Sequence, residues 1–424
     1  MSSDTTHPVQ QSSPRPTHRA WWLVLVLLAV GSLVYYWTPL WPFDRYSGGF
    51  IDLQVYRLGI EAMRDGGDLY GELPKTSAGI GLPFIYPPFA AIALAPFALL
   101  PWGLAKILYV AVSIAAVAWT LYLVALRYHL QRKHAAMLVA ACALPVAMLL
   151  EPVRSTIDFG QVNLLLMVLV ATDCLLPKTR YPRGMLIGLA AAIKLTPAAF
   201  VLFFLVRKDY KSAATAAATG AIATLVSFAL LPTESVRYWF GGLGNVSGLS
   251  GSAFHTNQSI QAVLARLHIT GLPFDALWLI FGALLLALVV AAMRKAVDAP
   301  AIALSLNAVF TLLLSPISWS HHWVWIAPAL LAIACHARTL PARAAAGWYT
   351  TAAVVTAVFV IAPHDFLPDG ERRETAWSWW QHFVGDTYVW LAVVLVVLYM
   401  VTGRRRTPPA ATSTEKPDQE AIPA

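Results

Sequence analysis

The chain has 424 residues, of which 58% are hydrophobic and only 12% are charged. Ordinary soluble domains carry roughly 45–50% apolar and 25% charged residues, so this composition excludes a soluble globular protein. The formal net charge is +8, but the Lys and Arg residues fall in short loops and form no long basic arm, which argues against a nucleic-acid partner. The apolar runs approach the roughly 20 residues that a helix needs to cross a bilayer. We therefore expect an all-α polytopic membrane protein whose main surroundings are lipid.

The apolar runs also predict the organisation of the chain. We expect a polar tail at residues 1–20, one membrane unit at residues 21–402 and a second tail at residues 403–424. The apolar run from Trp21 to Phe43 is too long for the core of a signal peptide, so it is predicted to be a retained first span. Spans are expected near residues 21–43, 104–126, 135–150, 162–177, 212–231, 273–293, 301–318, 323–337, 346–363 and 387–402.

The charges of the loops predict the orientation, because cytoplasmic loops of membrane proteins are enriched in Lys and Arg. In the plasma membrane, both termini are then cytoplasmic, and the loops that carry the polar motifs face outward. The basic loops expected inside are residues 127–134, 178–183, 207–211, 294–295, 338–343 and 404–406. The segments expected outside are residues 44–82, 151–161, 232–272, 319–323 and 364–386.

Two apolar stretches do not fit this alternation. Residues 82–102 contain five prolines, which interrupt a regular helix, so we expect a re-entrant or tilted piece on the outer side. Residues 184–206 run between two basic loops and hold Lys194 and Pro197 at their centre. Proline disfavours helical geometry at the residue before it, which predicts two half-helices meeting at Lys194. Such irregular backbone at membrane depth is tolerated where it lines a cavity enclosed by protein.

The cysteines give no sign of a metal site or a disulfide framework. Cys142, Cys174 and Cys335 lie in or at the ends of apolar runs, without the spacing of metal ligands. We interpret them as packing residues.

Asp52 lies in the short polar stretch that follows the first expected span. Leu53, Tyr56, Ile60 and Met63 recur at helical spacing behind it, which predicts an amphipathic helix along the membrane interface. Asp52 can serve as the N-cap of that helix, because Asp accepts hydrogen bonds from the first free amides. It can equally serve as a general base at the membrane surface, and the two roles are compatible.

A second polar cluster, EPVRSTIDFGQVN at residues 151–163, lies between two expected spans. A solvated loop would account for it. The alternative is that Arg154 approaches the intramembrane Lys194, since a lysine inside an apolar run costs roughly 2.5–3.5 kcal/mol and suggests a function. Two cations that converge on an outward cavity suit a phosphate group.

Two further outer segments carry polar motifs. Residues 232–272 contain a run of Gly and Ser and the motif HTNQS at residues 255–259, and these glycines match no phosphate-loop signature. The motif SPISWSHHW at residues 315–323 contains two tryptophans and two histidines. Belt tryptophans and polar helix ends would account for it. The adjacent histidines cannot place both rings on one helical face, which argues against a metal pair.

Together these motifs resemble a known family. FIDLQVY, LPFIYPP, EPVRSTIDFGQVN, AIKLTP, NQS and LLSPISWSHHWVW occur in the order found in glycosyltransferase family 87. Its members are actinobacterial polyprenyl-phosphate-mannose-dependent alpha-(1→2)-mannosyltransferases of the GT-C class. The resemblance covers roughly residues 45–390, and it implies a GT-C fold of about 10–12 transmembrane helices with an active site in the outer loops.

The resemblance also implies roles for individual residues. Asp52 corresponds to the catalytic carboxylate of the first outer loop and His322 to the active-site histidine. Many GT-C enzymes have two acids in that loop, whereas position 50 is Phe here, so no metal or other cofactor is expected. We expect Arg154, Lys194, His321 and His322 to face the donor phosphate. Contacts with substrate are expected from Tyr56, Tyr86, Glu151, Gln161, Asn163, Asn257, Gln258 and Trp319.

The implied chemistry is an inverting transfer. A beta-linked mannosyl phosphate attacked in line by a 2-hydroxyl gives an alpha product, and Asp52 would take the hydroxyl proton. Cations and donors directed at the departing polyprenyl phosphate would lower the barrier.

Several alternatives remain at this stage. The stretches ATDCLLPKTRYPRGMLIGLAAAIKLTPAAF and LPDGERRETAWSWWQ are more similar to the enzyme that branches lipomannan and lipoarabinomannan, so a mannan glycolipid is the expected acceptor. An enzyme that extends phosphatidylinositol mannosides is the alternative within the family. A transporter of lipid-linked sugars would also use broken helices, but the sequence shows one break and no evident repeat. A scaffold subunit would leave the outer polar motifs unexplained.

Overall fold

The computed structural model describes residues 49–129, 132–242, 252–370 and 373–403. Its regular elements in these ranges are helices, and one isolated β-bridge joins Asn257 to Trp319. The all-α expectation is therefore confirmed for the described residues. Both expected tails, apart from Gly403, and the first expected span at residues 21–43 lie outside them.

Within the described ranges, four helices are long and apolar enough to cross a membrane: α4 (Trp102–Tyr128), α10 (Tyr210–Leu230), α13 (Leu272–Lys295) and α16 (Ala342–Ile361). Two bent pairs raise the number to six if each counts as one span. One pair is α5 (Lys133–Leu149) with α6 (Glu151–Phe159), bent by 72°, and the other is α17 (Trp379–Gly385) with α18 (Thr387–Thr402), bent by 68°.

Several apolar runs that were expected as spans in the described ranges form short helices instead. They are α7 (Asn163–Leu175) with 13 residues, α14 (Pro300–Leu314) with 15 and α15 (Ile326–Ala337) with 12. At a rise of about 1.5 Å per residue, none of these covers a hydrocarbon core of about 30 Å. The apolar runs are present as expected, but breaks in the helices divide them.

The break expected at Lys194 is confirmed. Helix α8 (Met185–Ile193) ends there, and Lys194 has extended backbone with φ −147° and ψ 133°. The chain continues as η1 (Thr196–Phe200) and α9 (Val201–Val206). Helix α8 packs closely on α10, since a Cβ atom on Gly188 would lie 2.3 Å from the Ala216 carbonyl oxygen. Close backbone approach through small residues is typical of helix contacts in membranes.

The helix expected after Asp52 is α2 (Ile51–Arg64), but two expectations about it are wrong. Its N-cap is Phe50, in left-handed conformation with φ 58°, and no side chain caps the helix. Asp52 lies in the first turn instead. Leu53, Tyr56 and Ile60 are only 2–4% exposed, because α2 packs on α3 (Pro88–Leu99) and α6. The apolar side of α2 therefore faces protein, whereas the sequence analysis expected the membrane interface.

Proline shapes the stretch between α2 and α4. Pro88 begins α3, which contains Pro96, and Pro101 is the N-cap of α4. Residues 82–102 are thus one short helix with non-helical ends. Whether this piece is re-entrant stays a prediction.

A turn at Gly160 brings α6 against α2. Gly160 ends α6 with φ 76°, and a Cβ atom there would lie 2.6 Å from that of Leu53. No L side chain fits this combination of left-handed backbone and close approach. The expected outer loop at residues 151–161 is therefore mostly a helix that is held against α2.

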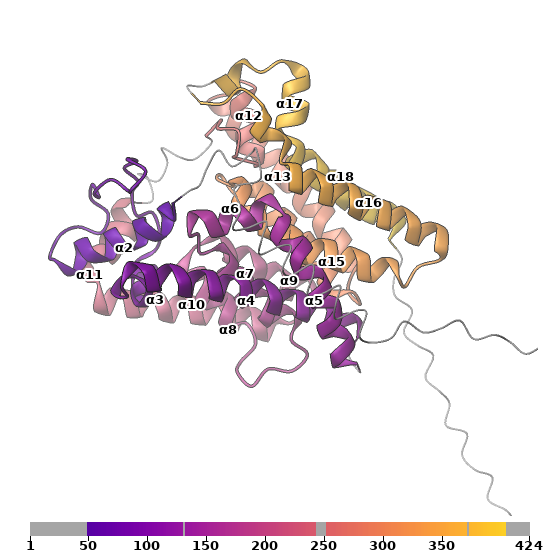
Figure 1. The fold of residues 1–424 in the computed structure, drawn as a ribbon, viewed down its shortest axis with the longest axis horizontal. Coiled ribbons are helices and arrows are strands. Elements are labelled where there is room, and N and C mark those ends of the chain that lie inside the picture. Colours follow the sequence, from indigo (N-terminus) through magenta and orange to yellow (C-terminus); the bar gives the residue numbers. More distant parts are fainter. Residues whose placement is uncertain (1–48, 130–131, 243–251, 371–372, 404–424) are drawn as a thin grey trace, which may run out of the picture.

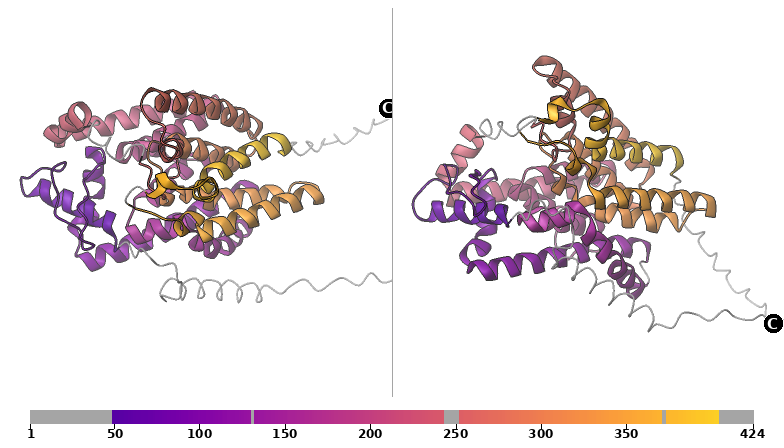
Figure 2. Two further views of the ribbon diagram at one scale, coloured as in Figure 1. Left: turned by 90° about the horizontal axis from the view of Figure 1, so that it is seen from above. Right: turned by 45° about the horizontal axis from the view of Figure 1, so that its top comes forward.

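Short elements form the remaining segments that were expected outside. They are α11 (Pro232–Val236), the π-helical η2 (Arg237–Gly242), α12 (Ile260–Arg266), η4 (Ser320–Trp325), η5 (Pro363–Phe366) and η6 (Arg373–Ala376). Figure 1 shows α12 and α17 close together at the top, while α2 and α11 lie at the left end. The two views of Figure 2 show α16 and α18 extending together away from α2.

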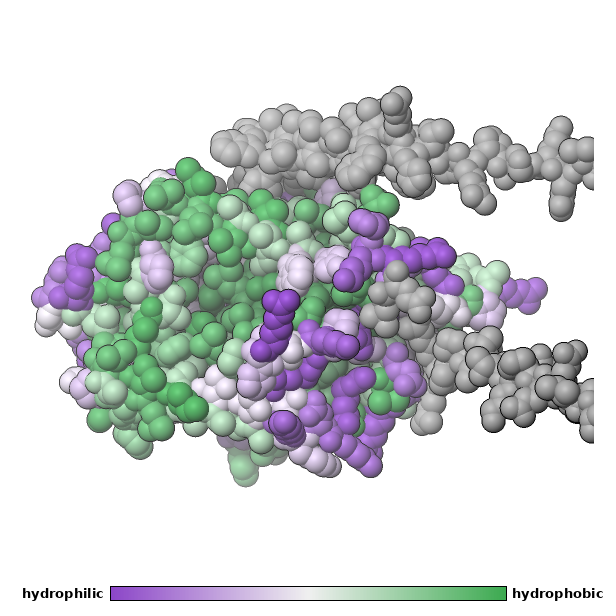
Figure 3. Space-filling model, turned by 90° about the horizontal axis from the view of Figure 1, so that it is seen from below, coloured by the Kyte–Doolittle hydropathy of each residue, from purple (hydrophilic) through white to green (hydrophobic). Residues whose placement is uncertain are grey.

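The surface is consistent with membrane insertion. Figure 3 shows a broad apolar area on one face, with hydrophilic residues gathered toward its ends. Large exposed apolar side chains lie on the four long helices, such as Ile107, Ile222, Leu284 and Val354. Apolar surface of this extent favours contact with lipid. The chain is therefore a multi-pass membrane protein.

Candidate active site

The candidate site lies where four parts of the fold meet. They are α2, the junction between α6 and α7, the non-helical residues that follow α8, and η4. Three buried side chains form its first hydrogen-bond network. The Tyr56 hydroxyl donates to Gln161 Oε1 at 3.0 Å, and Gln161 Nε2 donates to the Tyr86 hydroxyl at 3.0 Å. The Tyr109 hydroxyl lies 2.9 and 2.8 Å from the carbonyl oxygens of Thr156 and Gln161. This contact fixes the turn that presents Gln161.

Asp52 lies beside this network. Gln161 hydrogen-bonds its carboxyl group, and Lys194 is close enough to act on it electrostatically. Burial nevertheless raises the pKa of Asp52 to about 7, because removal from water penalises the charged form more than Lys194 and Gln161 favour it. A carboxyl group that titrates near neutral pH is suited to accept a proton in catalysis.

Lys194 is the cation of the site. Its Nζ atom donates to Asn163 Oδ1 at 3.1 Å and lies 3.3 Å from His322 Nε2. The same atom is 5.6 Å from the centre of the Tyr86 ring. The extended backbone of Lys194 directs the side chain toward α7 and η4. An ammonium group has three N–H donors, so two are engaged by these neutral partners and a third remains for an anion.

His322 is neutral in this environment. Burial holds its pKa well below the usual value, and the charge of Lys194 lowers it further. The ring also hydrogen-bonds the backbone of Ile317, which fixes its tautomer and leaves Nε2 facing the Lys194 ammonium. Lys194 and His322 thus form a polar pair, and Asp52 is close enough to act on the Lys194 charge.

His321 has a different position. Its carbonyl oxygen accepts hydrogen bonds from Thr156 Oγ1 at 2.6 Å and from Asn163 Nδ2 at 3.1 Å. Its ring lies against Phe159, with 5.2 Å between ring centres, and burial lowers its pKa to about 3. The residue therefore fixes the main chain of η4 through its carbonyl. Contact of its ring with a donor phosphate stays a prediction.

A small cavity adjoins the Lys194 and His322 pair. It has a volume of about 40 Å³, and Asn163, Lys194, His322 and Trp325 contribute to its walls. A volume of this order holds one or two water molecules, and the polar groups of Asn163, Lys194 and His322 in an otherwise largely apolar wall can bind them. The cavity can therefore accept a small polar group next to the cation.

Arg154 lies on α6 and acts electrostatically on other groups of the chain. Its charge acts on Asp365 and on Tyr388, which places it toward the outer segment that contains η5. Glu151 is buried on the same helix and accepts hydrogen bonds from Ser155, Ser320 and Tyr388. Convergence of Arg154 and Lys194 on a phosphate group, and contact of Glu151 with substrate, stay predictions.

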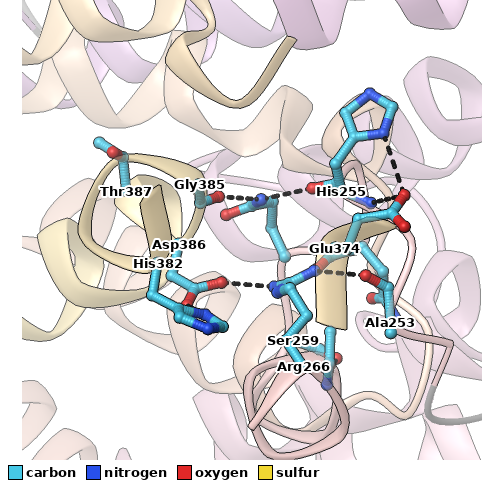
Figure 4. A network of polar contacts seen from close by, with 12 residues as sticks. Ala253, His255, Ser259, Arg266, Glu374, His382, Gly385, Asp386 and Thr387 are labelled. Atoms are coloured by element: carbon cyan, nitrogen blue, oxygen red, sulfur yellow. Dashed lines mark hydrogen bonds and ion pairs between the residues drawn. The ribbon is translucent and has the colours of Figure 1, made fainter. Parts of the chain in front are cut away.

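Asn257 and Gln258 connect the outer segments to one another. Asn257 Oδ1 accepts from the Ser318 amide at 2.9 Å, and Gln258 Nε2 donates to the carbonyl oxygens of His255 and Gly385. Trp319 pairs with Asn257 through the isolated bridge. Figure 4 shows the neighbouring contacts, in which Arg266 reaches Asp386. These residues hold the loop before η4 in place, and substrate contact by Asn257, Gln258 and Trp319 stays a prediction.

The sequence analysis missed four residues that shape the site. Tyr109, Thr156 and Ser320 hold its turns, and Tyr388 binds Glu151 from α18. Thr156 and Ser320 lie inside recognised motifs and could have been noticed there. Tyr109 and Tyr388 lie in apolar runs, where an aromatic residue gives no signal of its partner.

Within the described ranges, no group of three or more His, Cys, Asp or Glu side chains is arranged to hold a metal ion. The three cysteines are free, and Cys174 and Cys335 are buried as expected for packing residues. The expectation of a metal-independent enzyme stays a prediction.

These observations define a multi-pass helical membrane protein with an acid, a cation and an imidazole gathered around buried polar space. The family description "Glycosyltransferase family 87" matches residues 84–316. A polyprenol-phosphate-mannose-dependent alpha-(1-2)-phosphatidylinositol mannoside mannosyltransferase of Mycolicibacterium smegmatis is 39% identical, over 93% of each chain. Its counterpart in Mycobacterium tuberculosis is 37% identical, over 93% of this chain and 94% of the relative.

The chain belongs to glycosyltransferase family 87. A polyprenol-phosphate-mannose-dependent alpha-(1-2)-phosphatidylinositol pentamannoside mannosyltransferase of M. smegmatis is 33% identical over 77% of this chain and 78% of the relative. Among solved structures, ArnT from Cupriavidus metallidurans bound to undecaprenyl phosphate matches 91% of this chain and 78% of its own. That match has 16% identity and a TM-score of 0.40, a similarity too low to define a shared fold.

Proposed function

We propose that the protein is an inverting alpha-(1→2)-mannosyltransferase that moves mannose from polyprenyl-phosphate-mannose to a phosphatidylinositol mannoside. The observation that carries the proposal is the contact of Lys194 with His322 beside Asp52, in a chain of family 87. The names of the relatives support the donor and the linkage.

The proposed roles follow from charge. Asp52 accepts the proton of the acceptor 2-hydroxyl while that oxygen attacks the anomeric carbon. The bond from this carbon to the phosphate oxygen breaks on the opposite side, so the configuration inverts. The pKa of Asp52, about 7, leaves this carboxyl group about half ionised at neutral pH. A base whose pKa lies near the working pH transfers protons most effectively.

Lys194 and His322 stabilise the phosphate that leaves. Negative charge grows on the phosphate as the bond breaks, and a fixed ammonium group lowers the barrier because it needs no reorganisation. His322, with its ring held by Ile317, keeps the ammonium group in place. Gln161, Tyr56 and Tyr86 fix the Asp52 carboxyl on the other side.

For the acceptor, the names of the relatives favour the alternative over the mannan glycolipid expected from the sequence. The motif similarities favoured lipomannan and lipoarabinomannan, whereas the names of the relatives specify phosphatidylinositol mannosides. The two acceptors share mannose units on a lipid anchor. We therefore take a phosphatidylinositol mannoside as the acceptor and lipomannan as the competing substrate.

Transfer by purified protein tests the proposal. The protein in detergent receives labelled polyprenyl-phosphate-mannose and, in parallel reactions, a phosphatidylinositol mannoside or lipomannan. We expect a new alpha-(1→2) linkage on the phosphatidylinositol mannoside. A product on lipomannan alone would correct the acceptor, and movement of intact donor across vesicles without a new bond would indicate a transporter.

We also propose that the site faces the outer side of the plasma membrane, on the basis of the loop charges. Cysteines introduced at Ala78 and His134, both exposed, would report the two sides in a chain whose native cysteines are replaced. An impermeant thiol reagent added to spheroplasts should label position 78 and spare position 134. Equal labelling would contradict this orientation.

A further inference from the structure

Glu151 is a buried carboxylate whose expected role was contact with substrate. It is only 3% exposed. Its Oε1 atom accepts hydrogen bonds from Ser155 Oγ at 2.7 Å and from Ser320 Oγ at 2.8 Å, and its Oε2 atom accepts from the Tyr388 hydroxyl at 3.0 Å. A carboxylate offers about four acceptor positions. Three hydroxyl groups of the chain therefore occupy most of them, and little remains for a substrate hydroxyl.

The three donors come from different elements. Ser155 lies on α6 with Glu151, Ser320 begins η4, and Tyr388 lies in the first turn of α18. Tyr388 is itself fully buried and stacks on Phe359 of α16, with 3.9 Å between ring centres. Glu151 thus joins α6 and η4 to a fixed point at the outer end of α16 and α18.

The consequence concerns η4, which carries His322. Ser320 precedes His322 by two residues, and the carbonyl of the residue between them is held by Thr156 and Asn163. These contacts set the start of η4 from the side of α6 and α7. Since His322 Nε2 lies 3.3 Å from Lys194 Nζ, a shift of η4 by a fraction of an ångström would separate this pair.

We propose that Glu151 is a positioning residue: through Ser320 and Tyr388 it fixes η4 so that His322 meets Lys194 at the phosphate site. The inference rests on the proposed function, because it assigns that site its geometry. Glu151 itself touches neither donor nor acceptor.

Substitution of Glu151 and of its partners distinguishes this role from substrate contact. Misplacement of a catalytic group by about 1 Å costs roughly 100-fold in rate, so we expect Glu151→Ala to lower kcat about 100-fold. The KM for the acceptor should change less than about threefold, because no acceptor contact is lost. Glu151→Gln should recover most of the rate, because hydroxyl groups can turn to accept from an amide as well as donate to its oxygen.

The partners should reproduce the effect while the carboxylate stays in place. We expect the double variant Ser320→Ala with Tyr388→Phe to lower kcat nearly as much as Glu151→Ala does. Ser155→Ala is the matched control: it removes a hydroxyl of the same network that lies on α6 and does not reach η4. Its kcat should stay close to that of the unmodified protein.

Different results would overturn the inference. Glu151 would be a substrate contact if Glu151→Gln were as inactive as Glu151→Ala and both raised the KM for the acceptor. In that case the double variant Ser320→Ala with Tyr388→Phe would keep nearly normal activity. A normal kcat for Glu151→Ala would remove any role. Mannosyl transfer by the unmodified protein tests the proposed function independently of Glu151. The affinity for polyprenyl phosphate, measured without turnover, reports the state of the phosphate site in every variant. We expect weaker binding for Glu151→Ala and unchanged binding for Ser155→Ala.

Discussion

Lys194 and Arg266 are two cations shielded from water in different parts of the molecule, and their surroundings differ. Arg266 is fully buried, forms an ion pair with Asp386 at 2.6 Å and donates to the backbone carbonyls of Ala253, Phe254 and Asn257. Lys194 contacts neutral Asn163 and His322 and borders a cavity. The donors of Arg266 face the chain itself, whereas Lys194 keeps capacity for an anion.

The comparison shows that burial of a charge does not identify a functional site. A buried ion pair whose terminal guanidinium nitrogens also donate to the backbone is a structural element, and its loss costs stability. A buried cation with neutral partners retains an electrostatic attraction for a ligand. The outer cluster of Figure 4 is of the first kind, and the break after α8 is of the second.

The largest effect is expected at Asp52. Asp52→Asn removes the proposed base, so kcat should fall roughly 10²–10⁴-fold. The N-cap of α2 is Phe50, so no capping contact is lost and the protein should stay folded. Turnover and donor affinity are measured on one preparation, and donor binding should persist. Near-normal turnover would assign the base to another group, with Asp158 the next carboxylate to examine.

The second effect concerns stability. Asp386→Asn leaves Arg266 buried without its counter-ion, which typically costs about 3–5 kcal/mol. We expect a large fall in the denaturant midpoint, while kcat per folded molecule changes little. Arg266→Met combined with Asp386→Asn is the control, because it removes both charges and should unfold less readily than Asp386→Asn. A fall in kcat without a loss of stability would move the cluster into the catalytic machinery.

The third effect is on donor affinity. Lys194→Met keeps most of the side-chain stem and loses the charge. A hydrogen bond to a charged group contributes about 1.5–3 kcal/mol, so donor binding should weaken about 10–100-fold. Lys106→Met is a matched control, because Lys106 lies over the rings of Phe50 and Trp102. Unchanged donor affinity with altered thermal stability would give Lys194 the structural role assigned to Arg266.

The smallest effect is on the pH profile. Since Asp52 must be ionised to act as a base and its pKa is about 7, activity should be lost as the pH falls. Below about pH 6, kcat/KM should decline about tenfold per pH unit. The residual activity of Asp52→Asn should lack this acid limb. A profile that stays flat down to pH 5 would mean that the titrating group does not control turnover.

Much of the architecture could be read from local signals. Pro197 and the charges around residues 184–206 located the break at Lys194, and the motifs located Asp52, Gln161 and His322 in one site before their distances were known. The length of individual helices could not be read in this way. Hydropathy measures apolar content, and it does not register the bends between α5 and α6 or between α17 and α18.

Three features could not be read from the sequence, for a common reason. The apolar side of α2 packs on α3 and α6, Arg154 acts on Asp365, and Glu151 accepts hydrogen bonds from Ser320 and Tyr388 of distant elements. Periodicity tells which side of a helix avoids water, but it does not tell whether lipid or protein covers that side. The partner of a polar side chain more than 100 residues away leaves no local trace.

The sequence by itself determined that this is a helical membrane protein of glycosyltransferase family 87. It also determined that the helix is interrupted at Lys194 and that Asp52 is the acid of the first polar stretch. Composition and motifs carry that information, because it depends on residue types and short spacings. Only the tertiary structure decided that Lys194 meets His322, that burial raises the pKa of Asp52 to about 7, and that Glu151 joins α6, η4 and α18. Those properties depend on desolvation and on contacts between distant elements, which exist only when the helices are packed.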